Sequence, residues 1–520
     1  MAKFVTSNIS ILDPLRLHKD RLTQVSVKET YDIKVWPVTN ISNDGPITFV
    51  VPPQPKGMLY EVFLTTKVKL QKDGDDITEP CNDVSIVNNF SNSLWSQVDV
   101  QLDDRTDITQ SMKHAYAYQS FFNHALNSES NRTDYLLFNE RFMMDEGKTK
   151  TSEENVRQFW VWNDFIDFKV KSMVTPQSES QAKQIQKVEN SKELFWKADR
   201  QDLDTIDDIA VALGYSKQDA PDQREKILKL MDEVWIGCEN LAASERSRDL
   251  NRGESLTLCS KLQCPIFNTG KCLPTNMNIK VTLNNQNSDK FLILSESDDY
   301  SIKIEDCYLQ ITYWRPYDIA LEKAEKALAK EPAPYTIEKP EIILKPIVNA
   351  SQTIRVSDIF NKKLPSYAFF CLQNNDDYEG NMRTNPFTFI PFKKFQFYRN
   401  GVPFFKDPLE LTVSESNGQV FYSDFGDYLR QLYSTVGKGL KGDCLINSKN
   451  FLLHFMVGMS FGADRSTLAD DHLNLQEHAS TYLEIDMGTT KVSSNMVLLV
   501  YALYDQQIQI DQDRAVHIVE

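Results

Sequence analysis

Apolar and polar residues alternate with a period of two along many short segments of this chain, and this alternation limits the folds that it can adopt. In 25–36, the apolar positions Val25, Val27, Tyr31, Ile33 and Val35 share one face. Successive side chains of a strand point to opposite faces, so this pattern is typical of a β-strand buried on one side. It recurs at 61–70, 98–102, 277–283, 300–313, 353–356, 367–372, 395–397, 482–485 and 496–504.

The residues between these segments favour antiparallel connections. Asp73-Gly74, Asn400-Gly401 and Gly488 are turn formers, and Pro52-Pro53 ends another segment. Helices do not alternate with the expected strands, whereas a parallel sheet needs a long crossover between consecutive strands. We therefore expect an all-β fold built from antiparallel sandwiches or barrels.

One strand–turn–helix unit occurs twice. In the first copy, the strand 98–102 meets the polar pair Asp103-Asp104, and in the second copy 395–397 leads to Asn400-Gly401, so the two turns lie 297 residues apart. An amphipathic helix follows each turn, with apolar residues at i, i+3, i+4 and i+7. Two similar units in tandem explain this repeat. The helical positions are Tyr118, Phe121, Phe122 and Ala125 in the first copy and Phe425, Tyr428, Leu429 and Leu432 in the second.

The boundaries of the two units follow from breaks in the pattern. We expect an N-terminal arm at 1–24, a first unit at 25–320, a linker at 321–340 and a second unit at 341–520. The first unit carries a polar, partly helical insertion at 129–252. Its apolar stripes are Ile206, Ile209, Ala210 and Leu213, and then Ile227, Leu228, Met231 and Trp235, while the linker starts as a helix at Leu321–Lys330 and meets prolines at Pro332, Pro334 and Pro340.

Composition restricts the partners of the chain. Lys and Arg number 57 and Asp and Glu 73, which gives a net charge of −16, while 41% apolar and 25% charged residues are values of a globular protein. The net negative field repels nucleic acid, so any contact with DNA has to be local. Only 18 glycines weigh against a fold with several glycine-rich phosphate loops.

No segment approaches the roughly 20 apolar residues of a membrane helix. The best candidates, 451–462 and 496–504, are shorter. The first eight residues lack the uninterrupted apolar core of a signal peptide, so we expect a protein that is not secreted. The eight cysteines then fit a reducing compartment.

Motifs for phosphate binding are incomplete. Gly147-Lys148-Thr149 resembles the end of a phosphate-binding loop, but Phe142 occupies the place of the first glycine. Gly270-Lys271-Cys272 fails in the same way, with Pro265 at that place. We expect both to be ordinary loops.

Metal-ligand patterns are equally weak. The seven histidines contain no His-x-His pair. We expect the acidic cluster Asp470-Asp471-His472 with Glu477-His478 to be a surface loop. The spacing of Cys259, Cys264 and Cys272 matches no paired zinc motif, so we expect free thiols. We assign no catalytic, cofactor-binding or metal-binding residue, and we expect no cofactor and no enzymatic activity.

A resemblance to a known family is carried by four segments, Asn92–Asp104, Ala115–Phe121, Tyr308–Pro316 and Phe395–Gly401. These segments resemble the major capsid proteins of Maverick/Polinton elements and the related adintoviruses. The resemblance implies two tandem eight-stranded antiparallel jelly rolls, a double jelly-roll. It also implies homotrimers that form pseudo-hexagonal capsomers and tile an icosahedral shell around DNA.

The same resemblance implies partners and a location. A single-jelly-roll penton protein would occupy the vertices, and the mildly basic arm at 1–24 would touch packaged DNA or link capsomers. The chain would be made in the host cytoplasm or nucleus and reside in the virion capsid. Tryptophans are candidate anchors of the trimer, although core packing is the commoner role. They are Trp36, Trp95, Trp160, Trp162 and Trp314.

Two alternatives come from other functional classes. One is a double-jelly-roll enzyme or carbohydrate-binding protein, which would need a concave site with bound sugar or metal. The other is a host interaction protein descended from a capsid gene, which would keep the fold without forming shells.

Overall fold

The structure is a computed structural model that describes residues 24–41, 45–77, 84–103, 106–107, 112–126, 133–145, 246, 249–250, 253–295, 299–347, 352–380, 385–416, 419–437, 444–465, 477–488 and 495–519. The expected arm up to residue 23 and the helical stripes expected at 206–213 and 227–235 lie outside the described residues. Within them, the fold is all-β with a few short helices, as the alternation predicted.

The first unit, which we define as β1 to β11, contains two main sheets. One has the order β1-β11-β3-β8, with β4 as a short hairpin partner of β3, and the other has the order β2-β9-β6-β7. The strands are β1 (Val27–Val35), β2 (Ile47–Val51), β3 (Met58–Lys72), β4 (Asp75–Asp76), β6 (Trp95–Leu102), β7 (Thr106–Asp107), β8 (Leu256–Lys261), β9 (Ile279–Gln286) and β11 (Tyr300–Pro316), and β5 (Val84–Ile86) pairs separately with β10 (Ile293–Ser295).

The second unit, β12 to β23, repeats this plan. Its sheets have the orders β12-β22-β14-β20 and β13-β21-β15-β16. The strands are β12 (Ala333–Ile347), β13 (Thr353–Ser357), β14 (Tyr367–Asn374), β15 (Lys394–Arg399), β16 (Val402–Pro403), β17 (Leu409–Glu410), β20 (Val457–Ser460), β21 (Thr481–Asp486), β22 (Met496–Ile510) and β23 (Val516–Val519), with β18 (Thr412–Ser416) and β19 (Gln419–Ser423) as a separate hairpin.

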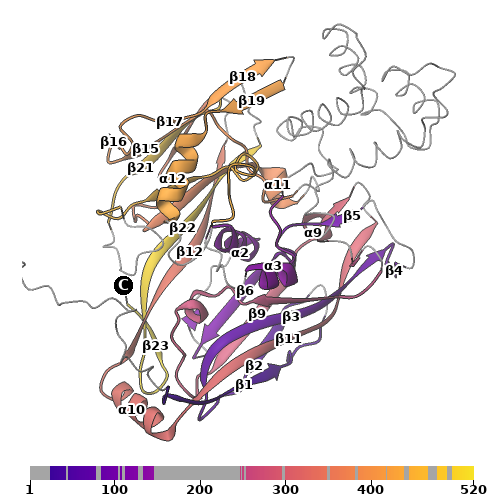
Figure 1. The fold of residues 1–520 in the computed structure, drawn as a ribbon, viewed down its shortest axis with the longest axis vertical. Helices are drawn as coiled ribbons and strands as arrows, with labels where there is room; N and C mark the ends of the chain where they lie inside the picture. Colours follow the sequence, from indigo (N-terminus) through magenta and orange to yellow (C-terminus); the bar gives the residue numbers. More distant parts are fainter. Residues whose placement is uncertain are drawn as a thin grey trace, which may run out of the picture.

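The two strand orders are the same once each strand is matched to its counterpart. In both units the first strand pairs with the long strand near the end of the unit (β11 or β22), that strand pairs with the third (β3 or β14), and the third pairs with the strand that follows the helical region (β8 or β20). Four strands in each of two facing sheets, connected in this order, form a jelly roll. The chain is therefore a tandem of two jelly rolls, and Figure 1 shows the first unit (indigo to pink) below the second (orange to yellow).

The repeated turns adopt the backbone that their residues favour. Asn400 (φ 51) and Gly401 (φ 78) both have positive φ, as a two-residue hairpin turn requires, and Asp103 (φ 57) has the same sign at the matching turn. Each turn precedes its predicted helix, α2 (Ala115–Leu126) and α12 (Gly426–Val436). The remaining helices are α1 (Phe90–Ser93), α3 (Thr133–Glu140), the 3-10 helix η3 (Pro265–Asn268), α9 (Asp289–Leu292), α10 (Asp318–Leu328) and α11 (Asn375–Glu379).

The connection between the units differs from the expected linker in one respect. Its helix is present as α10, but the chain enters strand β12 at Ala333. Pro334 and Pro340, which suggested irregular chain, lie within this strand, and with Pro346 they are spaced six residues apart. Because β12 is at the edge of its sheet, alternate residues of β12 need no N–H group for pairing with β22. Prolines at these alternate positions can therefore be accommodated without loss of a hydrogen bond of the sheet. Proline was therefore a misleading signal here.

Part of the expected insertion belongs to the folded body. Helix α3 packs against β8, and Phe142 and Asp145 just after it are buried. The described helices include none that is long and apolar enough to cross a membrane.

Candidate functional site

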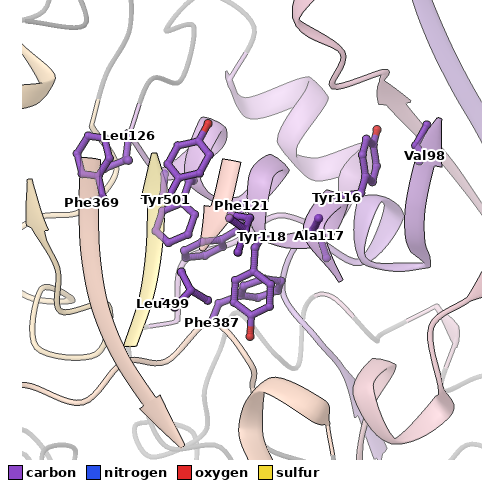
Figure 2. Close-up of a cluster of buried hydrophobic side chains, with 14 of the residues drawn as sticks. Val98, Tyr116, Ala117, Tyr118, Phe121, Leu126, Phe369, Phe387, Leu499 and Tyr501 are labelled. Atoms are coloured by element: carbon purple, nitrogen blue, oxygen red, sulfur yellow. The ribbon is translucent and has the colours of Figure 1, made fainter. Parts of the chain in front are cut away.

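Helix α2 lies between the two units and forms the centre of their junction. Its first-unit side contacts β6, and its other side reaches β12 and the outer face of β22 and β14. The Phe122 ring stacks on Tyr501 with centroids 4.8 Å apart, and the Phe121 ring stacks on Phe387 at 4.5 Å. Figure 2 shows Tyr118 and Phe121 of α2 between Val98 of β6 and Tyr501 of β22.

Hydrogen bonds fix the register of this junction. The Tyr501 hydroxyl donates to Asn123 Oδ1 over 2.7 Å, and the Tyr118 hydroxyl lies 3.1 Å from both Gln373 Oε1 and the Pro386 carbonyl. Burial raises the pKa of both phenols, so they stay protonated donors. The junction therefore combines apolar contact with a fixed geometry.

The segment Met496–Tyr504, which we expected to alternate, is instead a continuous nine-residue apolar run, and this junction explains why. All nine residues are buried, because the inner face of β22 contributes to the second-unit core and α2 covers the outer face. The sequence of a strand that is buried on both faces is continuously apolar and does not alternate between apolar and polar residues.

A second contact between the units surrounds His114. Its ring stacks on Phe291 at 4.3 Å, and its Nδ1 donates to Asn287 Oδ1 over 2.8 Å. Burial lowers the pKa of His114 to about 4, with the neighbouring Lys113 acting in the same direction. From the second unit, Gly380 approaches the backbone of Phe291 so closely that an added Cβ would lie 2.6 Å from its Cα.

A buried ionic cluster, which we call the neck, joins the two ends of the segment 146–245. Asp145 Oδ1 and Arg246 Nη1 are 2.8 Å apart, with side chains 2% and 0% exposed. Arg141 Nη2 lies 2.5 Å from Asp249 Oδ2 beside them. Asn385 of the second unit also donates to Asp145, so the neck is attached to both units.

Further support for the neck comes from carbonyl groups and a histidine. Arg246 donates to the carbonyls of Ile86 and Met143 over 3.2 and 2.9 Å. His454 Nδ1 donates to the carbonyl of Phe387 over 2.7 Å, and burial lowers the pKa of its imidazole. The imidazole therefore remains neutral beside the buried pair.

The C-terminal hairpin β22–β23 is tied to the linker helix. Arg514 Nη2 lies 2.8 and 2.9 Å from the two carboxylate oxygens of Glu325 in α10, and its Nε donates to the Thr275 carbonyl over 2.7 Å. This triple contact joins the second unit, the linker and a loop of the first unit. Together with α2 and the neck, it fixes the placement of the units.

The tryptophans that we considered as trimer anchors or core residues differ in how deeply they are buried. Trp95 is 1% exposed and belongs to the core, whereas Trp36 is 53% exposed on the outer side of β1. Trp314 is half-buried and stacks on Tyr60 at 4.1 Å. Trp160 and Trp162 lie outside the described residues.

Those residues of the weak metal and phosphate motifs that the structure describes contact other partners. Glu477 pairs with Arg399 at 2.9 Å, and Lys271 donates to the Pro334 carbonyl, while Gly147-Lys148-Thr149 and Asp470-Asp471-His472 lie outside the described residues. Cys259, Cys264 and Cys272 are free thiols. Across the part of the chain that is described, no group of three or more His, Cys, Asp or Glu side chains could hold a metal ion.

The described residues also include a small polar recess in the second unit, about 250 Å³ in volume. Its lining is Gln352, Thr353, Lys393, Val413, Asp486 and Gly488.

Sequence reasoning missed His114, Asp145 and Arg246. None of them belongs to a recognisable motif, and their partners are distant in the chain. The buried pair could have been suspected only from knowledge of the fold.

Comparison with known proteins gives similarity at the level of fold. No family model matches the sequence, and no curated protein matches it. A chain in the cryo-EM structure of the Sputnik virophage superposes with a TM-score of 0.54 at 10% identity, covering 99% of this chain and 93% of that chain. The Faustovirus major capsid protein gives 0.48 at 8% identity (94% and 92% covered), and the mavirus major capsid protein 0.46 at 8% (100% and 96%).

The strand orders and the likeness to the Sputnik chain define the class of this protein. It is an all-β double jelly-roll protein, as the resemblance implied.

Proposed function

We propose that this chain is a viral-type major capsid protein that forms homotrimeric, pseudo-hexagonal capsomers of an icosahedral shell around DNA. The observation that carries the proposal is the pair of jelly rolls with one strand order, held to each other through α2. Three such chains present six similar lobes, so a closed threefold ring approximates a hexagon. Its function is structural, without enzymatic activity.

The several independent contacts between the two units support this role. A capsomer transmits load only if its two lobes keep one relative placement, and α2, the neck and the Arg514–Glu325 contact all act on that placement. The likeness in fold to a chain of the Sputnik virophage particle is a second support.

The finer features belong to the same proposal. The chain would derive from a Maverick/Polinton or adintovirus-like element and would act with a single-jelly-roll penton protein at the vertices. The arm at 1–24 would contact packaged DNA or neighbouring capsomers through Lys3, Arg16, Lys19 and Arg21. The protein would be made in the host cytoplasm or nucleus and would end in the virion.

Native mass measurement and negative-stain electron microscopy of the purified chain test the proposal. We expect trimers, and particles or flat hexagonal arrays when the salt concentration is raised, because salt screens the repulsion between acidic capsomers. A chain that stays monomeric at all concentrations would contradict the proposal, as would bound metal or sugar at one equivalent per chain.

A second experiment addresses the arm. Deleting residues 2–20 should leave trimers intact and reduce the yield of closed particles. An unchanged particle yield would remove the arm from the proposal without affecting the trimer.

A further inference from the structure

Two buried histidines lie on opposite sides of the junction between the units, and each packs against an aromatic ring of the other unit. His114 of the first unit meets Tyr378 of α11 edge-on, with ring centroids 5.5 Å apart. The ring of His454, in the second unit, lies 5.7 Å from that of Phe121 in α2. The two histidines are 1% and 0% exposed. The junction therefore encloses one titratable imidazole from each unit.

The hydrogen bonds of the two imidazoles are alike. Nδ1 of His114 donates to Asn287 Oδ1 over 2.8 Å, and Nδ1 of His454 donates to the carbonyl of Phe387 over 2.7 Å. In each neutral ring Nε2 then carries no proton, and within the described part of the chain this atom is buried without a hydrogen-bond partner. A proton added to Nε2 would thus place a charge on a ring that is shielded from water.

The charged groups around His114 do not compensate for its burial. Lys113 is next to the ring and disfavours a proton there, whereas Glu379 of α11 favours the proton but is paired with Lys113. Burial is the largest effect and lowers the pKa of the imidazole to about 4. The other titratable side chains on the elements that pack against the ring are Asp289 and Lys290 of α9 and Asp376, Asp377 and Tyr378 of α11.

The surroundings of His454 have the same net effect, although this histidine lies beside the neck. Burial disfavours a proton most strongly, Asp145 favours it and Arg246 opposes it, so the pKa of the imidazole is lowered. The segment 385–389 beneath the ring carries no charged side chain. The titratable side chains of α2 are Tyr116, Tyr118 and His124, of which His124 pairs with Glu140 of the first unit at 2.6 Å.

We infer that the junction is an acid-sensitive joint: protonation of His114 and His454 separates the two units while each jelly roll stays folded. Separation is the motion that brings water to both imidazoles, because a side chain of the other unit covers part of each ring. Figure 1 shows α11 of the second unit beside α9 of the first, where Gly380 and Phe291 approach each other closely. These contacts would open together with those of Phe121.

The inference goes beyond the proposed function. In the proposed shell, such a joint would let an acidic compartment of the host loosen the capsomers. Neither the inference nor its test requires that the chain assembles, so a chain that forms no trimer would contradict the proposed function and leave the joint untouched.

The expected size of the effect follows from the linkage between proton binding and opening. The pKa of His114 is about 4 in the closed joint, against an ordinary value of 6.5. Lowering the pH from 8 to 5 should therefore shift the equilibrium towards the open joint by about 30-fold through this residue alone. His454 adds to the shift, because its pKa is lowered as well.

Hydrogen exchange of the wild-type chain at pH 8 and pH 5 tests the inference. The Leu445 amide donates to the Ala125 carbonyl of α2 across the junction over 2.8 Å, so its protection from exchange reports opening of the joint. After correction for the intrinsic exchange rates, we expect this protection to fall by about 30-fold or more at pH 5. We also expect it to lie below the protection of β9 and β15, which belong to the interior of each unit.

Two results would overturn the inference. Unchanged protection of Leu445 at pH 5 would show that acid does not open the joint. Equal protection of Leu445, β9 and β15 at pH 5 would show that the units separate only when the whole chain unfolds.

Substitution by asparagine tests the two histidines themselves. The side-chain NH2 of Asn can replace the Nδ1 donor but takes up no proton. His114→Asn and His454→Asn should each reduce the dependence of Leu445 protection on pH, and the double variant should remove most of it. His478→Gln is the matched control, because His478 is an exposed histidine of the second unit, and it should leave the dependence unchanged. A double variant with the wild-type dependence and the wild-type circular dichroism spectrum would contradict the assignment to these histidines.

Discussion

The carboxylate of Asp145 and the guanidinium of Arg246 form a buried ion pair although the residues are 101 positions apart in the chain. The pair closes the base of the segment 146–245 and, through Asn385, attaches that base to the second unit. The neck thus joins Asp145, Arg246 and Asn385, which are far apart in the chain.

Removing one partner of this pair should destabilise the protein strongly. Arg246→Met leaves a carboxylate in a site with 2% exposure, and loss of one partner of a buried pair costs about 3–5 kcal/mol. Urea denaturation followed by circular dichroism measures the change. Lys326→Met, which breaks the exposed pair with Glu322, is the control and should cost about 0.5 kcal/mol or less. Equal losses in the two variants would mean that the pair is not buried as described.

The segment 146–245 should be replaceable by a short linker. Its ends are held within one ion pair, so about six Gly and Ser residues can span them. We expect the shortened chain to keep its β-sheet circular dichroism spectrum and its melting temperature within a few degrees. Adding Arg246→Met to the shortened chain should lower the melting temperature. An unfolded shortened chain would show that the segment contributes to the core.

Phe122→Ala should weaken the contact between the units. Phe122 is 0% exposed and stacks on Tyr501, and truncation of such a side chain costs about 3–5 kcal/mol. The expected signature is earlier unfolding of one unit than the other in denaturant, because the contact that couples them is lost. Tyr317→Ala, at 46% exposure, should have little effect. A single unchanged transition would argue against coupling through α2.

Stability should fall as the pH is lowered from about 6.5 to about 4, in part because of His114. Its pKa is lowered to about 4 in the folded protein, so the unfolded chain binds the proton more tightly throughout this range. The stabilisation is complete above pH 6.5 and, at 1.36 kcal/mol per pKa unit, amounts to roughly 3 kcal/mol.

The variant His114→Asn tests this effect, and Asn also tolerates the positive φ of 60° at this position. It should flatten the dependence of unfolding free energy on pH between 4 and 6.5. Val38→Asn, at an exposed position without a titratable side chain, is the control and should leave the dependence as in the wild type. Burial lowers the pKa of His454 as well, so this residue should contribute a slope of the same sign in the wild type and in the variant. An unchanged slope in His114→Asn would contradict the role of His114.

The strands could be predicted from sequence where one face is buried and the other is exposed. The alternation at 25–36, 61–70 and 300–313 corresponds to β1, β3 and β11. The repeated turn and helix correctly indicated two units of one plan. β12 was missed because prolines usually end strands, and only the edge position makes them acceptable.

The contact between the units could not be read from local patterns. The run 496–504 shows that something covers both faces of the strand, but periodicity does not say which helix provides the cover. Likewise, Asp145 and Arg246 look like ordinary surface charges until the fold brings them together. Long-range pairing of this kind is a property of the topology rather than of any sequence window.

The placement of α2 has a consequence for synthesis of the protein. Asn123 and its partner Tyr501 are 378 positions apart, so at about 5–20 residues per second the ribosome makes the second roughly 20–75 seconds after the first. During that interval, the aromatic side of α2 has no partner strand and is open to unwanted association. Nascent chains should therefore need a chaperone to shield this helix, and translation pauses ahead of β22 should lower the yield of folded protein.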